Sequence, residues 1–178
     1  MDAHETNTQP TGVEVSPSVD ALKLQMAMQQ LRDNQNLGMA VFGGSLAAIV
    51  GAVLWAVVTA VTQWQIGFMA IGVGFLVGLA VRKMGQGVTT AFGVVGAVLS
   101  LAGCLVGNYL ANCAFIAASE NMGIFDVIGR IDFATAVELM TATFHPMDVL
   151  FYGLALYYGY KFSFRVVTEE ELATMMKA

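Results

Sequence analysis

The chain has 178 residues, of which 57% are hydrophobic and only 12% are Asp, Glu, Lys or Arg. Soluble domains usually contain about 25% charged residues, so this composition excludes an ordinary soluble domain and indicates an integral membrane protein. The formal net charge of −5, without any cluster of basic residues, argues against a nucleic-acid-binding protein.

The first 18 residues are polar and rich in Thr, Pro, Ser and acidic side chains. They contain too few apolar residues to offset the entropy lost on ordering, so residues 1–18 are expected to form a mobile tail. They also lack the basic and apolar regions of a signal peptide.

Residues 19–36 are expected to contain a cytoplasmic amphipathic helix over residues 19–33, capped by Ser18. Its apolar residues at helical spacing are Leu24, Met28 and Leu31. We favour a helix that lies on the membrane surface before the first span. The alternative is a helix that binds a partner, for example in a coiled coil.

Four apolar segments follow, at about residues 37–61, 66–81, 88–117 and 146–164. A membrane-spanning helix needs roughly 20 mostly apolar residues to cross about 30 Å of hydrocarbon. Between Asn34 and Ser119 only Arg82 and Lys83 are charged, and we interpret this pair as the turn between two spans. The predicted fold is therefore all-α: a polytopic membrane protein with four transmembrane helices over residues 37–166 and flanking amphipathic helices.

Small residues recur at intervals of about four in three of these spans. This spacing lets the backbones of membrane helices approach closely. Because the stripes exceed what one short bundle needs, we infer that spare stripes mediate homo-oligomerisation or docking to a larger membrane complex. The residues predicted to pack helices are Gly44, Ala48, Ala52, Gly74, Gly78, Gly103 and Gly107.

The third span carries a polar stripe at i+4 spacing, formed by Ser100, Cys104, Asn108 and Asn112. Polar side chains are costly in lipid unless they have partners, so the stripe should face protein or water. We favour hydrogen bonds between helices. The alternative is the lining of a small permeation path or binding cavity in an oligomer. Along a helix, Cys104 and Cys113 would be about 13 Å apart, too far for a disulfide.

Residues 118–145 are the one sizeable polar segment between spans, and Asp132 is placed to cap a short helix there. The apolar face of that helix would contain Phe133, Val137, Met140 and Phe144. We expect it to rest at the membrane interface, with a re-entrant plug as the alternative.

The last span should begin at Pro146, because proline is favoured in the first helical turn. Asp148 would lie where the helix dipole stabilises an acid. Thr168 and Glu171 then form a capping box, which predicts a short cytoplasmic helix within residues 167–178.

Counting basic residues gives the orientation. With four spans, one side of the membrane holds seven basic residues and the other side holds Arg130 alone. The seven are Lys23, Arg32, Arg82, Lys83, Lys161, Arg165 and Lys177. The positive-inside rule therefore predicts that both termini are cytoplasmic and that residues 118–145 face outward. The residues closest to the spans, and thus the main determinants, are Arg82, Lys83, Lys161 and Arg165.

Candidate catalytic and metal-binding groups are sparse. A zinc site needs three or four converging His, Cys or acidic ligands, and here only His145 and Asp148, with Glu138 or Asp132, could meet. Ser100 and Cys104 have no ionisable companion at their depth to act as a base. We therefore expect neither an enzyme nor a bound metal or cofactor.

Two blocks carry a resemblance to a known group of proteins. They are WQIGFMAIGVGFLVG with AVR at residues 64–78 and 80–82, and PMDVLFYG with GYKFSFR at residues 146–153 and 159–165. The chain resembles a set of small bacterial four-span inner-membrane proteins over residues 37–166. The resemblance implies that topology and a bacterial inner membrane. It implies no activity and assigns no functional residue.

The function expected from these features is that of a structural or accessory membrane subunit. Its partners would be the lipid bilayer and either further copies of the chain or other membrane proteins, but not nucleic acid. A small oligomeric channel or transporter is the second possibility, and an enzyme the third.

Overall fold

The computed structural model describes residues 19–64 and 67–177. Within these residues all regular structure is helical, which confirms the all-α prediction. The predicted tail and its capping Ser18 lie outside the described residues. The helices are α1 (Val19–Asp33), α2 (Leu37–Thr62), α3 (Met69–Gly85), α4 (Thr90–Ser119), α5 (Ile124–Arg130), α6 (Phe133–Ala142), α7 (Pro146–Phe162) and α8 (Glu169–Lys177).

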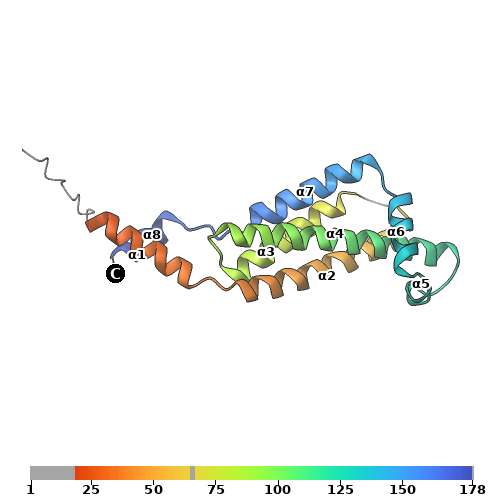
Figure 1. The fold of residues 1–178 in the computed structure, drawn as a ribbon, viewed down its shortest axis with the longest axis horizontal. Coiled ribbons are helices and arrows are strands. Elements are labelled where there is room, and N and C mark those ends of the chain that lie inside the picture. Colours follow the sequence, from red (N-terminus) through yellow and green to blue (C-terminus); the bar gives the residue numbers. More distant parts are fainter. Residues whose placement is uncertain (1–18, 65–66, 178) are drawn as a thin grey trace, which may run out of the picture.

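Four of these helices, α2, α3, α4 and α7, lie side by side in an elongated bundle (Figure 1). Helices α3 and α4 are both central, because each packs against the other three helices of the bundle. At one end α1 extends beyond the bundle and packs against α8 (Figure 1). At the other end α6 runs across the bundle, and α5 packs on the last turns of α4.

Two helices of the described part, α2 with 26 residues and α4 with 30, are long and apolar enough to cross a membrane. Helices α3 and α7 have 17 residues each. Length and composition by themselves therefore identify two candidate spans rather than the four predicted. Helix α4 is the longest helix of the described residues, and its last turns carry Cys113 and Ala117, which pack against Val127 of α5.

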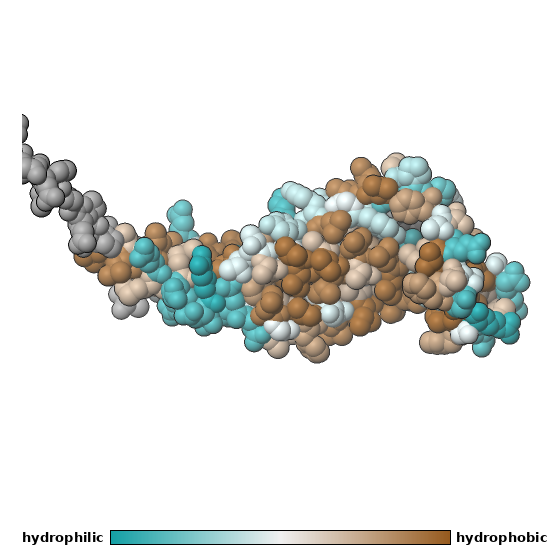
Figure 2. All heavy atoms as spheres, viewed as in Figure 1, coloured by the Kyte–Doolittle hydropathy of each residue, from teal (hydrophilic) through white to brown (hydrophobic). Residues whose placement is uncertain are grey.

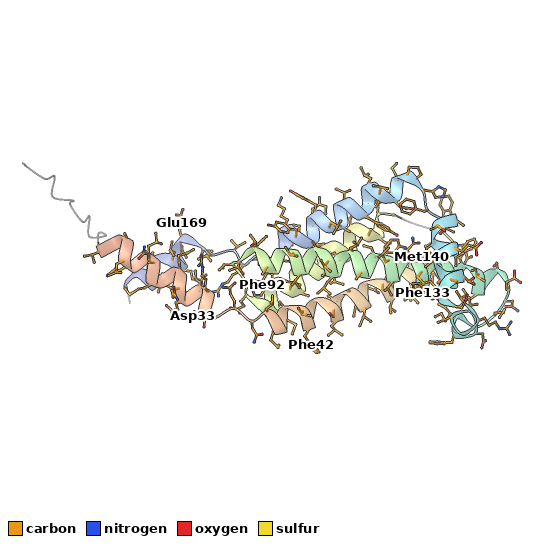
Figure 3. All side chains as sticks on the ribbon, in the orientation of Figure 1. Asp33, Phe42, Phe92, Phe133, Met140 and Glu169 are labelled. Carbon is orange, nitrogen blue, oxygen red and sulfur yellow. The ribbon has the colours of Figure 1, made fainter. Side chains whose placement is uncertain are left out.

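Many of the large apolar side chains of the bundle are exposed on its outer surface. Phe42 projects from the outer side of α2 (Figure 3), with 62% of its surface exposed. The inner side of the same helix consists of small residues such as Ala40, Ala48 and Ala52. Figure 2 shows the result: hydrophobic residues cover much of the visible face of the bundle, and hydrophilic residues gather toward the two ends of the elongated molecule.

The interpretation of Arg82 and Lys83 as a turn is wrong. Both residues belong to the last turn of α3, which continues to Gly85. Cations are stabilised at the negative end of the helix dipole, so this placement is favourable. The helix instead ends at Gln86, which adopts a left-handed conformation (φ 48°) and donates its backbone N–H to the Arg82 carbonyl oxygen.

Within residues 118–145, the capped helix is confirmed, since Asp132 accepts a hydrogen bond from the Thr135 amide at the start of α6. Helix α5 was not predicted, because seven residues are too few to show a clear period. The C-terminal helix α8 is confirmed, and the Thr168 hydroxyl caps it through the Glu171 amide at 3.3 Å. The Glu171 carboxylate, however, pairs with Arg165 rather than completing a capping box.

Three connecting segments are joined at the α1–α8 end of the bundle. The Gln35 side-chain oxygen accepts hydrogen bonds from the amides of Val88 and Thr89 at 3.1 and 3.2 Å. The Arg165 amide donates to the Gly87 carbonyl oxygen at 2.8 Å. The links before α2, between α3 and α4, and after α7 therefore hold one another in place.

Candidate functional site

The polar stripe of α4 faces the interior of the bundle, as predicted. Ser100, Cys104 and Asn112 are buried, and Asn108 is partly buried. Helix α4 presents its opposite, apolar face to the outside through Val94, Val98 and similar residues.

Each member of the stripe has a hydrogen-bond partner. The Ser100 hydroxyl donates to the Gly96 carbonyl oxygen of its own helix at 2.6 Å. The Cys104 thiol lies 3.7 Å from the Ala70 carbonyl oxygen of α3 and donates weakly to it. The Asn108 amide donates to the Tyr152 hydroxyl of α7 at 2.8 Å.

The last member, Asn112, extends this network toward the α5–α6 end of the bundle. Its amide donates to the Asn108 side-chain oxygen and to the Thr143 hydroxyl, both at 3.3 Å. Among the described residues, every buried side-chain nitrogen or oxygen has a hydrogen-bond partner. The stripe therefore links α4 to α3, to α7 and to the segment before α7, as the favoured interpretation requires.

The predicted packing residues all lie at contacts between helices of this one chain. A Cβ atom added at Gly74 would lie 2.5 Å from the Ala155 carbonyl oxygen of α7, and one at Gly78 would lie 2.9 Å from Phe162. An added Cβ atom at Gly103 would lie 3.1 Å from Ala48 of α2.

The two remaining contacts follow the same pattern. An added Cβ atom at Gly107 would lie 3.3 Å from the Cα atom of Ala52, and one at Gly44 would lie 2.7 Å from Val81 of α3. Because all of these stripes are occupied within the chain, the premise that they are spare is wrong.

A small cavity of about 70 Å³ adjoins the stripe at Asn108. It is lined by Trp55 of α2, by Gly67 and by Asn108 of α4. His145, directly before α7, and Asp148 and Tyr152 within α7 complete the lining. This volume has room for a few water molecules, and Asn108, Asp148 and Tyr152 supply polar groups for them.

The residues considered as metal ligands serve to begin α7. The Asp148 carboxylate accepts a hydrogen bond from the His145 backbone amide at 2.8 Å, and Pro146 occupies the first helical position. Neither Asp132 nor Glu138 lines the cavity. Within residues 19–64 and 67–177 no group of three or more His, Cys, Asp or Glu side chains could hold a metal ion.

Sequence reasoning missed two residues of the network, Tyr152 and Thr143. Both hydroxyl groups come from outside α4, and their pairing with Asn108 and Asn112 depends on the rotation and depth of α7. The one available signal was that Tyr152 lies in an apolar segment, where a buried hydroxyl needs a partner.

Taken together, the stripe and cavity offer hydrogen-bond donors and acceptors at the centre of a membrane-sized bundle. Comparison with known proteins found no matching family model, curated protein or solved structure.

Proposed function

We propose that the chain is a four-span integral membrane protein of the bacterial inner membrane that acts as a structural or accessory subunit. The observation that carries this proposal is the distribution of side chains in the bundle. Many large apolar residues point outward, while the interior combines glycine, alanine and paired polar groups with a few larger side chains such as Trp55 and Val77. Such an arrangement suits a solvent of lipid, which rewards close packing and internal hydrogen bonding.

Helices α3 and α7 are proposed as the third and fourth spans. Seventeen residues at 1.5 Å each give about 26 Å, at the short end of what a bilayer accepts. Helix α3 packs against α2 and α4, and α7 packs against α3 and α4 (Figure 1). Both helices expose apolar residues such as Phe75, Val149 and Leu150. Basic side chains at their ends, including Lys161, extend the usable length by reaching the headgroups.

The orientation is proposed from the positive-inside rule. Lys23 and Arg32 lie on α1, at the end of the bundle where α3 and α7 place Arg82, Lys83 and Lys161. Arg130 lies on α5 at the opposite end. This distribution supports cytoplasmic termini and an outward-facing α5–α6 segment.

Cysteine labelling tests the topology. Cys104 and Cys113 are buried, so single cysteines introduced at exposed Thr90 and at exposed Gly129 provide the signal. A membrane-impermeant maleimide applied from the periplasmic side should label the cysteine at position 129 and not the one at position 90. Labelling at position 90 in intact spheroplasts, or solubility without detergent, would contradict the proposal.

The partner-binding role is assigned to α1 with α8. Ala27 and Leu31 are buried, but Leu22 and Met26, one turn apart on α1, are exposed beyond the end of the bundle. An exposed apolar pair outside the membrane favours the partner-binding alternative for this helix.

The alternative function is a small oligomeric channel or transporter lined by the polar stripe. Its support is weaker, because Ser100, Cys104 and Asn108 face helices of their own chain and the adjoining cavity is only about 70 Å³.

Flux and crosslinking separate the two functions. Protein in liposomes should carry no ion or small-solute flux, whereas a flux that disappears in Asn108→Leu would establish the channel. In native membranes, a crosslinker on Met26→Cys should capture a stable neighbour. Leu22→Glu should abolish that crosslink. Arg32→Gln, which makes the same change of charge at an exposed position of the same helix away from this pair, should not. Capture of monomers alone would overturn the subunit proposal.

A further inference from the structure

We propose that the chain binds the phosphate group of an anionic phospholipid at the α1–α8 end of the bundle. The site is a pocket of about 360 Å³ between the last turns of α3 and the segment that follows α7. Its lining residues are Leu79, Arg82, Lys83, Gln86, Arg165 and Val166. The choice of a lipid as the source of the phosphate rests on the membrane location proposed above.

The positive charge of this pocket comes from two distant parts of the sequence. Arg82 and Lys83 end α3, and Arg165 follows α7. The Glu171 carboxylate of α8 pairs with Arg165, so three cations and one anion leave a net charge of +2. The dipole of α3 explains cations at its own C-terminus, but it does not explain why a third cation from another segment joins them.

Arg165 is held in position before any ligand binds. Its guanidinium donates to the Gln86 side-chain oxygen at 3.0 Å and also contacts Glu171. Its backbone amide donates to Gly87 at 2.8 Å. A guanidinium whose position is fixed loses little entropy when it binds a phosphate, and its planar fork suits phosphate oxygens.

The surroundings of the pocket favour a lipid over free phosphate. Leu79 and Val166 contribute apolar lining, and Val166 is exposed. One helical turn from Leu79 toward the middle of the bundle, Phe75 is exposed and packs edge-on against Phe162 of α7 at 4.9 Å. An acyl chain that leaves the pocket would therefore meet an apolar wall. Basic pockets between spans on the cytoplasmic side bind anionic headgroups in this way.

The test is native mass spectrometry of the full chain, purified in detergent and loaded with equal phosphatidylglycerol and phosphatidylcholine. The wild type should retain phosphatidylglycerol preferentially. Arg82→Gln with Lys83→Gln should weaken that retention on the order of 10- to 30-fold. The control, Lys23→Gln with Arg32→Gln, removes the same charge from exposed positions on α1 and should retain the lipid as the wild type does.

A third variant and a competition arm complete the test. Glu171→Gln removes the internal counter-charge of Arg165 and should increase phosphatidylglycerol retention severalfold. Millimolar inorganic phosphate should not displace the lipid, and displacement would show a free-phosphate site instead. Equal retention of both lipids by the wild type, or equal loss in the control pair, would overturn the proposal. A protein that passes the topology test but shows no lipid preference would refute this site alone.

Discussion

Replacing Gly159 with alanine tests the closest approach of α7 to α4. A Cβ atom at this position would lie 2.7 Å from the Gly96 carbonyl oxygen and would also overlap the Ser100 hydroxyl. Carbon and oxygen atoms normally approach no closer than about 3.3 Å, so the two helices would have to separate by about 0.6 Å. The obstructing carbonyl belongs to a helix backbone, which cannot rotate away as a side chain could.

The expected cost follows from that separation. A gap of about 0.5–1 Å removes a quarter to a half of the dispersion energy of the atoms it separates, and overpacking of this kind costs about 1–3 kcal/mol. For a chain of this size, such a loss lowers the melting temperature by about 2–12 °C. The same displacement lengthens the hydrogen bond between Asn108 and Tyr152, which joins the same two helices.

The chain provides both a reporter and a matched control for this measurement. Cys104 and Cys113 are buried and unpaired, so a thiol-reactive fluorophore reports unfolding in detergent. Gly153 lies on the same helix, and a Cβ atom there would meet nothing within 4 Å. Gly153→Ala should therefore melt like the wild type. Equal melting of Gly153→Ala and Gly159→Ala would refute the inferred contact.

Three further predictions concern the ends of the bundle and its centre. Gln35→Ala removes the acceptor for the Val88 and Thr89 amides and should cost about 1 kcal/mol, the typical net contribution of a hydrogen bond to stability. Hydrogen exchange at these amides should accelerate, and unchanged exchange would contradict the assignment. Two hydrogen bonds from Thr135 lower the pKa of exposed Asp132, and the bond from its side chain has a larger effect than the bond from its amide. Because the folded-state pKa lies below the unfolded value, Asp132 should stabilise α6 above the unfolded pKa and lose this effect as pH falls through the folded pKa. Amide hydrogen exchange in α6 should show this pH dependence in the wild type, and it should not do so in Asp132→Asn. Finally, Cys104 should resist a water-soluble thiol reagent in the folded protein, since it is fully buried, and rapid labelling would reveal an aqueous path.

Much of the candidate site followed from local pattern. The i+4 spacing of Ser100 to Asn112 placed four polar side chains on one face of α4, and their cost in lipid required that this face be covered. What covers it could not be inferred, because Tyr152 and Thr143 lie some 30–45 residues away in sequence. The glycine stripes were likewise recognised as packing surfaces, but how many of them contact helices of the same chain was underestimated.

The sequence by itself determined that the described chain is helical, and it placed most helix boundaries within a few residues. These properties depend on composition, on the helical period and on caps such as Asp132, all of which act within one or two turns. Tertiary structure alone decided that Gln35 binds the amide of Val88, 53 residues further on, and that Arg165 joins Arg82 in one pocket. Such contacts depend on the rotation, depth and spacing of packed helices, and no local pattern encodes those quantities.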